Sequence, residues 1–258
     1  MWLVFDIETV PDAAAGRRWL GLGAETADHD VRLAMMEARR AQTGAAAFLK
    51  PAFHQIVAIA GALIDEQGSL RRLRALGEPS ANEPYLVAEF FRIVQESRPR
   101  LVGWNSSGFD LPALVYRAVR HNVVTPAFYR AGEPYHSYRK RYDEELHIDL
   151  MDLLSGYGAS AKLSLHEMAS VLGVPGKMDV SGEDVLTLYV EGAIDRIREY
   201  CMRDVMTTTV IFGQFAHHRG WLADDAWTTF QASIQQFLTE HADSHWTEYA
   251  RQWQSWAD

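Results

Sequence analysis

The sequence has little of what would place it in several common protein classes. Only one of its 258 residues, Cys201, is a cysteine, which excludes an intramolecular disulfide and a zinc site built from several cysteines. The longest uncharged apolar run, residues 56–64, is far too short to span a bilayer. The first residues lack the basic segment, apolar stretch and cleavage site of a secretory signal. We therefore expect a cytoplasmic protein with no membrane segment.

Positive charge is also scarce. Lysine and arginine together number 25 against 34 aspartates and glutamates, so the formal net charge is −9. Proteins that coat duplex DNA gain their affinity from cations that neutralise phosphates, and the charge balance argues against that class. It is compatible with an enzyme that holds a few nucleotides and takes positive charge from metal ions. Hydrophobic residues make up 48% of the chain, which is enough for a substantial core.

The pattern of apolar residues predicts an α/β fold. Apolar runs typical of strands lie at residues 2–5, 56–64, 70–76 and 101–104. Helical spacing and capping signals predict helices at residues 82–96, 111–121, 149–154, 163–172, 182–191 and 193–217. Residues 124–145 are expected to form a loop. Strands followed by helices that alternate with one more strand are typical of a layered α/β domain.

The same pattern indicates one domain over residues 1–217. Within it, residues 12–53 are rich in alanine, arginine and glycine, and we interpret them as a helical insertion. Residues 218–258 are predicted to form a helical C-terminal extension. The extension carries five of the eight tryptophans, and we expect these to pack it onto the domain.

Two carboxylates follow the first predicted strand. Asp6 and Glu8 are two residues apart, so on a strand both side chains point to the same face. We place them at the C-terminal end of a central strand, where α/β sheets carry their sites. Two carboxylates this close repel each other unless a cation neutralises them. The alternative is a strand end with solvated acids.

Two further segments place polar residues near helices. A Gly/Ser loop from Asn105 leads to Asp110, whose position at a helix start is also explained by capping. In the predicted helix at residues 193–217, Tyr200 and Asp204 are four residues apart and therefore share one face. A pair at this spacing is expected about once by chance, so it carries little meaning in isolation.

Together these residues resemble the DEDD superfamily of 3′–5′ exonucleases, in its tyrosine-containing branch. The residues that match are Asp6, Glu8, Asp110, Tyr200 and Asp204. The F-D-I-E-T start, the N-x-x-x-F-D loop and the Y-x-x-x-D helix occur in the family's order. The likeness is strongest to stand-alone bacterial exonucleases related to the proofreading domain of family B DNA polymerases. It covers roughly residues 1–215 and includes the runs H-I-D-L-M-D-L-L and L-G-V-P-G-K. A histidine-type member would need a histidine where this chain has Glu199.

The resemblance implies a ribonuclease H-like fold with a mixed central sheet. It also implies stepwise hydrolysis at the 3′ end of single-stranded nucleic acid, DNA being favoured, with release of nucleoside 5′-monophosphates. Two divalent ions, Mg²⁺ or Mn²⁺, are the implied cofactors. By analogy, Asp6 would bridge both ions, and Glu8 and Asp204 would complete the site beside the attacking water. Asp110 would hold the second ion, and Tyr200 would orient the water.

Several other residues are candidates for contacts with the substrate, namely Thr9, Asn105, Phe109 and Lys177. Asn105 would either bind the substrate or brace its loop. Core packing is an alternative for Phe109, and an ordinary turn lysine is an alternative for Lys177. Asp149 and Asp152 are expected to have structural roles at a helix N-terminus, and the alternative is that either one replaces one of the four assigned metal ligands.

Residues 129–142 form a basic segment interleaved with tyrosines. Its cations are Arg130, Arg139, Lys140 and Arg141, and its tyrosines are Tyr129, Tyr135, Tyr138 and Tyr142. Such a mixture could follow a single strand by charge and base stacking, or it could be a solvated loop.

Two alternative functions are considered. One is an RNA 3′-processing exonuclease similar to ribonuclease D, which has the same tyrosine motif. The other is a binding or assembly module that keeps the fold without catalysis. Modules of that kind usually lose an acidic ligand, whereas this chain has all four, which favours an enzyme.

Overall fold

A five-stranded sheet organises the chain. The structure is a computed structural model that describes residues 1–44, 48–131, 136–176, 182, 184–241 and 244–257. In this part of the chain the strands are β1 (Trp2–Pro11), β2 (His54–Ile64), β3 (Leu70–Ala75), β4 (Arg100–Gly103) and β5 (His147–Asp149). Their order is β3-β2-β1-β4-β5. β1, β2 and β3 pair antiparallel, while β4 and β5 are added parallel to β1. The sheet is therefore mixed, and the predicted α/β fold is confirmed.

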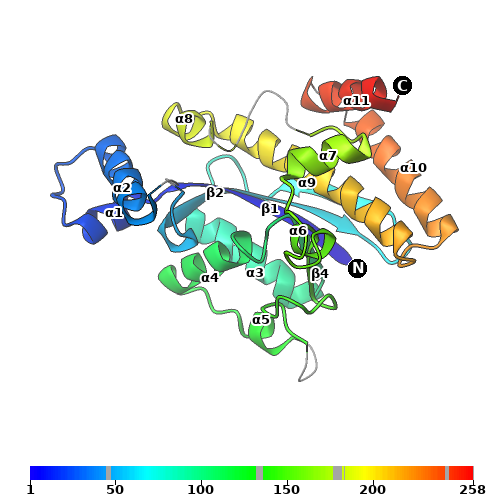
Figure 1. Cartoon of the computed structure of the whole chain (residues 1–258), viewed down its shortest axis with the longest axis horizontal. Helices are drawn as coiled ribbons and strands as arrows, with labels where there is room; N and C mark the ends of the chain where they lie inside the picture. Colours follow the sequence, from blue (N-terminus) through cyan, green and yellow to red (C-terminus); the bar gives the residue numbers. More distant parts are fainter. Residues whose placement is uncertain (45–47, 132–135, 177–181, 183, 242–243, 258) are drawn as a thin grey trace.

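Helices cover both faces of this sheet (Figure 1). One face packs against α3 (Glu83–Ser97), α4 (Asp110–Arg120) and α5 (Pro126–Arg130). The other packs against α7 (Leu165–Leu172), α8 (Val185–Val190), α9 (Ile194–His218) and α10 (Asp224–Glu240). Successive residues of β1 divide between the two cores: Leu3 and Phe5 face α3, whereas Trp2 and Val4 face α9. By this alternation Asp6 and Glu8 belong to the α9 face.

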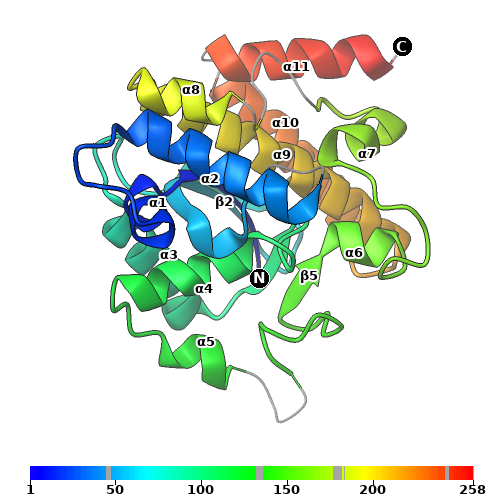
Figure 2. The same cartoon turned by 60° about the vertical axis from the view of Figure 1, so that its left-hand side comes forward.

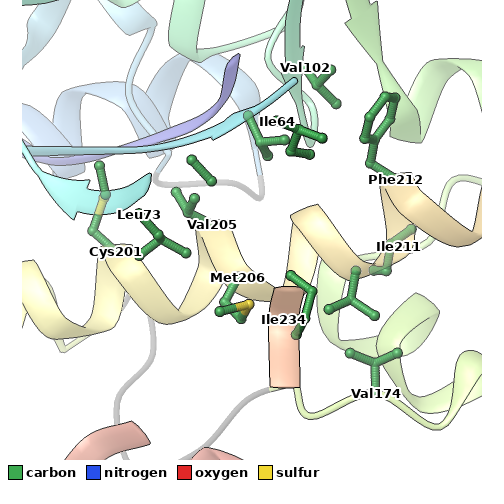
Figure 3. Packing of buried hydrophobic residues seen from close by; sticks show 14 of the residues in the cluster. Ile64, Leu73, Val102, Val174, Cys201, Val205, Met206, Ile211, Phe212 and Ile234 are labelled. Atoms are coloured by element: carbon green, nitrogen blue, oxygen red, sulfur yellow. The ribbon is translucent and has the colours of Figure 1, made fainter. Parts of the chain in front are cut away.

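The longest helix, α9, fixes the geometry of that face. It crosses the sheet and contacts β1, β2, β3 and β4. Figure 3 shows the buried contact surface, in which Val205 and Phe212 of α9 lie against Leu73 and Val102 of the sheet. All four side chains are less than a tenth exposed. Because protein interiors are close-packed, α9 is held at a fixed position relative to β1.

Two peripheral parts flank this frame. α1 (Ala13–Leu20) and α2 (Asp28–Thr43) lie at one end of the molecule in Figure 1 and come to the front in Figure 2, while the 3₁₀ helix η1 (Pro51–Phe53) contacts α4. α1 and α2 have a small core of their own around Val31 and Met35. At the C-terminus, α10 and α11 (Ser244–Ala257) pack near α9, where Trp246 is buried and the hydroxyl of Tyr249 lies 3.2 Å from that of Thr207.

Three details of the predicted secondary structure were wrong. β1 does not end at Phe5 but continues to Pro11, so Asp6 and Glu8 lie within the strand and not at its end. β5 was not predicted, because three residues are too few to show an alternating pattern. The predicted loop at 124–145 contains α5, a helix of only five residues. The short helix α6 (Leu150–Leu154) follows β5 directly. In the described residues no helix is long and apolar enough to cross a membrane.

Candidate active site

Asp6 and Glu8 lie on β1 just beyond the point where its pairing with the parallel strand β4 ends. β4 pairs with β1 only as far as Val4, so the later residues of β1 have no β4 partner. On the other side, Asp6 and Glu8 pair with Ala60 and Ala58 of β2. These alanines share the α9-facing side of the sheet, and their small side chains leave room for the two carboxylates. A break in the pairing register follows immediately after Glu8, as is common for bulges beside functional sites.

α9 brings three polar side chains to the same place. Tyr200 and Asp204 are one helical turn apart, as predicted, and a hydrogen bond joins them. Between them, the Cys201 thiol donates to the Asp6 carbonyl at 3.4 Å and to its carboxylate at 3.6 Å. Ligand atoms of Asp6, Glu8 and Cys201 all lie within 4.8 Å of one another. β1 and α9 are nearly 200 residues apart in sequence, and the fold makes them neighbours.

Asp110 reaches the site from α4. It is the first residue of that helix, and the preceding Phe109 occupies the N-cap position without a side-chain capping bond. The helix-cap interpretation of Asp110 is therefore wrong. Its side chain is buried, and its carboxylate accepts hydrogen bonds from the backbone N–H groups of Asp110 itself and of Ile7 on β1. Asp110 is thus directed toward β1.

The loop before Asp110 is held by Asp149. The Asp149 carboxylate accepts from the backbone N–H groups of Asn105 at 3.0 Å and Ser107 at 2.8 Å. It also caps α6 by accepting from Met151 at 3.1 Å, so its predicted structural role is confirmed. Asn105 has a left-handed backbone with φ of 58°, and its side-chain oxygen lies over Gly108. A Cβ at Gly108 would be 2.6 Å from that oxygen, so a larger residue there would displace the Asn105 side chain.

Burial raises the pKa values of the four acidic residues. Loss of hydration is the largest cause for each, and it raises the pKa of Asp110 to about 7 and that of Asp204 to about 6. For Asp6 and Glu8, repulsion from neighbouring carboxylates adds to burial and holds both pKa values well above the usual range. In the described part of the chain none of the four forms an ion pair with a basic side chain.

The phenol and the thiol remain protonated. Burial first, and then the charges of Asp204, Glu8 and Asp6, raise the pKa of Tyr200. Burial likewise raises the pKa of Cys201. A protonated phenol is a poor base, and a protonated thiol is a weak donor, since the thiolate is the form that binds metals. Both side chains therefore act at neutral pH as hydrogen-bond partners of the carboxylates.

The rings of Phe48, His54 and Phe109 contact one another beside β1 and form what we call the aromatic wall. The Thr9 hydroxyl lies 2.9 Å from His54 Nδ1, and the His54 ring meets Phe109 edge-on with ring centroids 5.0 Å apart. Phe48, which is 63% exposed, packs on Phe109 at 5.3 Å. Burial lowers the pKa of His54 to about 4, so this ring is neutral at pH 7.

The sequence prediction grouped Asp6, Glu8, Asp110 and Asp204 with Tyr200, and the structure brings the elements that carry them together. Other side chains at this place were not part of the prediction. It did not include Cys201, His54 or Phe48, since their positions depend on contacts between distant segments and no motif marks them. Lys177 lies outside the described residues.

The donor set suits a hard divalent cation. Four carboxylates provide oxygen ligands, which Mg²⁺ and Mn²⁺ prefer. Burial and repulsion between carboxylates raise the pKa values of Asp6 and Glu8, and a bound cation would offset both effects. The residues present therefore fit a metal centre.

Comparison with known proteins gives the family. The model of a family described as "Predicted 3'-5' exonuclease related to the exonuclease domain of PolB" matches residues 46–253. The chain belongs to this family of predicted 3′–5′ exonucleases, as the resemblance in the sequence implied. The matched range begins after Asp6 and Glu8, so the family match itself does not cover these two residues.

Individual relatives are distant. A DNA polymerase of Archaeoglobus fulgidus is 23% identical over 141 residues, which cover 51% of this chain and 17% of that protein. The family B DNA polymerase structure from Pyrobaculum calidifontis is 20% identical, with a TM-score of 0.51 over 83% of this chain and 24% of that chain. An exonuclease I structure is 14% identical and has a TM-score of 0.37, covering 96% of this chain and 45% of that chain. The chain thus spans a minor part of each, and the polymerase likeness concerns the fold.

Proposed function

We propose that this chain is a metal-dependent exonuclease that removes nucleotides from the 3′ end of single-stranded nucleic acid, with DNA favoured over RNA. The observation that carries the proposal is the convergence of Asp6, Glu8, Asp110 and Asp204 beside Tyr200. Burying carboxylates together without cationic partners costs free energy. Cation binding at this place best explains why the fold accepts this cost.

The carboxylates are proposed to hold two divalent ions, Mg²⁺ or Mn²⁺. In this proposal Glu8 and Asp204 would help to hold the ion beside the attacking water, Asp110 would help to hold the second ion, and Asp6 would serve both. When bound, such a pair of ions activates a water molecule and stabilises the leaving 3′ oxygen. Binding requires that the carboxylates lose their protons, so it is linked to pH.

Tyr200 is proposed to position the attacking water. Its protonated phenol donates to Asp204, which leaves the phenol oxygen free to accept a hydrogen bond from water. That contact turns a lone pair of the water toward phosphorus. The water oxygen then bonds to phosphorus and gives up one proton, while the bond from phosphorus to the 3′ oxygen breaks and that oxygen takes up a proton. The products are a nucleoside 5′-monophosphate and a strand one nucleotide shorter with a 3′ hydroxyl.

The aromatic wall is proposed to receive the terminal nucleotide. Phe109 adjoins Asp110 and packs against the exposed ring of Phe48, and bases stack on the faces of aromatic rings. Thr9, which follows Glu8 and is hydrogen-bonded to His54, is proposed to contact the sugar. Asn105 is proposed to act mainly by bracing the loop that carries Asp110.

The division of the chain is also a proposal. Residues 1–217 would form the nuclease domain, with residues 12–53 as an insertion and residues 218–258 as an extension. The separate small core of α1 and α2 supports the assignment of residues 12–53 as an insertion. The packing of Trp246 and Phe237 around the α9 face supports the assignment of residues 218–258 as an extension.

The test uses single-stranded DNA and RNA oligonucleotides labelled at the 5′ end. We expect a ladder that shortens from the 3′ end with Mn²⁺ or Mg²⁺, faster on DNA, with nucleoside 5′-monophosphates as products. Asp204→Ala should remove the ladder while circular dichroism shows a folded protein. The control is Asp195→Asn, an exposed acid on the same helix, which should keep full activity. A faster ladder on RNA would support the alternative of an RNA-processing enzyme, and no ladder on either polymer would support a binding module.

A further inference from the structure

A cavity of about 530 Å³ lies next to the loop that carries Asp110 and plays no part in the chemistry proposed above. It is bordered by Ser107 and Gly108 of that loop, by one face of α4, by α5 and by residues on either side of β5. Its volume is within the range of about 300–1,000 Å³ typical of small-ligand pockets. The cavity therefore adjoins the candidate active site at the β5 edge of the sheet.

One half of the cavity is apolar. Leu111 and Val115 contribute from α4, and Phe128 and Tyr138 form a stacked pair with ring centroids 5.4 Å apart. The Tyr138 hydroxyl donates to the Pro99 carbonyl at 2.8 Å, so this ring is part of a fixed wall. Both rings are almost fully buried and form the rigid backing of this half, so the apolar side chains that a planar ring can reach are those of Val115 and the exposed Tyr116 on α4.

The other half is cationic. Asp152, only 2% exposed, accepts from Arg141 at 2.6 and 2.9 Å and pairs with Lys162 at 2.6 Å. Two cations on one carboxylate leave one positive charge in excess, and Arg139 at the rim adds another. The guanidinium of Arg139 lies 5.3 Å from the ring centroid of Tyr129. In a chain with a net charge of −9, this is a local concentration of positive charge.

From this geometry we propose that the cavity binds one nucleotide of the substrate strand, upstream of the bond that is cut. The base lies against the apolar wall, and the adjoining phosphate contacts Arg139 and Lys162. The inference rests on the proposed exonuclease function, because the active-site loop supplies one border of the cavity. It assigns a role to the basic segment at residues 129–142 that the sequence left open between strand binding and simple solvation.

The combination of walls favours a nucleotide over other anionic ligands. A free phosphate would leave the apolar half unused, and an acidic peptide without aromatic residues, such as polyglutamate, has no planar ring to cover it. The exposed Tyr116 at the mouth offers an aromatic surface for a base. A free nucleoside 5′-monophosphate shares the chemistry of the strand's nucleotide, so the experiment must separate the two.

The experiment measures binding of a 5′-fluorescent dT12 oligonucleotide by anisotropy in EDTA, which separates binding from hydrolysis. Arg139→Gln is the main variant, because Arg139 does not pair with Asp152, and Lys162→Gln is the second. Arg72→Gln is the matched control, since Arg72 is an exposed arginine on β3 at the opposite edge of the sheet. Each variant is first checked for folding by its thermal midpoint.

We expect each cavity variant to raise the Kd for dT12 by about three- to tenfold. Each should also lower the slope of log Kd against log salt by about 0.7, the value for one phosphate contact to a single strand. A change confined to packing would not alter this slope. Arg72→Gln should match the wild type in both quantities.

Three results would overturn the proposal. The first is a wild-type Kd and salt slope in both cavity variants. The second is weaker competition by free thymidine 5′-monophosphate in the variants with unchanged dT12 binding, which would assign the cavity to a free nucleotide. The third is weaker competition by polyglutamate in the variants with unchanged dT12 binding, which would assign the cavity to an acidic peptide. A wild-type protein that binds dT12 through these residues but never shortens it with Mn²⁺ would refute the exonuclease proposal and not this one.

Discussion

Replacing Asp110 by asparagine should make the metal-free protein more stable. Asp110 is 4% exposed, and burial, together with the charge of Asp149, raises its pKa from 3.8 to about 7. Below about pH 4 the carboxyl is protonated in both the folded and unfolded states, so it adds no penalty. As pH rises toward 7, the unfolded chain loses the proton and the folded chain keeps it, so the free energy of unfolding falls. Above pH 7 the penalty is constant.

The size of this penalty follows from the two pKa values. A rise from 3.8 to about 7 corresponds to about 4 kcal/mol at pH 8. Asparagine removes the charge but keeps only one oxygen for the backbone N–H groups of Asp110 and Ile7, so one hydrogen bond worth about 1–1.5 kcal/mol is lost. The expected net gain is about 2–3 kcal/mol. For a protein of this size, that is a rise in Tm of roughly 5–10 °C.

The assay is thermal unfolding in EDTA at pH 8 and pH 4, followed by circular dichroism. The gain in Asp110→Asn should be present at pH 8 and absent at pH 4. Asp195→Asn makes the same substitution at an exposed position and should change the stability by less than about 0.5 kcal/mol. An Asp110→Asn variant that is no more stable than the wild type at pH 8 would refute the electrostatic account of this carboxylate.

Three further predictions concern stability, catalysis and pH. Arg117→Met should lower the free energy of unfolding by about 3–5 kcal/mol in urea titrations, because it removes the buried guanidinium that joins Asp12 and Glu83, leaving them only the more exposed Arg120 and His121; an unchanged midpoint would contradict this. Tyr200→Phe should lower the single-turnover rate constant about ten- to a hundredfold while the Kd for Mn²⁺ stays unchanged. An equal loss of Mn²⁺ binding would contradict the positioning role. Mn²⁺ affinity measured by calorimetry should rise from pH 5 to pH 8 as Asp204, with a pKa of about 6, and Asp110 lose their protons; a flat profile would contradict it.

The sequence predicted the frame of the fold well, since long periodic segments carry strong signals. β2 and α9 appear within two residues of their predicted bounds. β1 was predicted too short because its apolar run stops at Phe5, where polar residues begin. These residues stay in the strand because their backbone continues to pair with β2 as far as Pro11. β5 and α5 were missed because so few residues show no periodicity.

The candidate site was predictable where motif spacing alone defines a face. Tyr200 and Asp204 needed only the period of a helix, and Asp6 and Glu8 only that of a strand. Cys201, by contrast, enters the site through its hydrogen bond to Asp6, and that contact exists only after α9 crosses the sheet. The cavity beside the loop depends in the same way on α4, α5 and residues around β5, which come together only in the folded chain.

The central claim is that the buried carboxylates hold the cations that drive hydrolysis at the 3′ end. Its most direct test is Asp6→Asn, because Asp6 is the residue proposed to contact both ions. The measurement pairs Mn²⁺ binding by calorimetry with the rate of shortening of a 5′-labelled single strand. The wild type should bind Mn²⁺ and shorten the strand, while EDTA or Asp6→Asn should abolish shortening and weaken Mn²⁺ binding. An Asp6→Asn variant that cleaves at the wild-type rate with the same metal dependence would contradict the account.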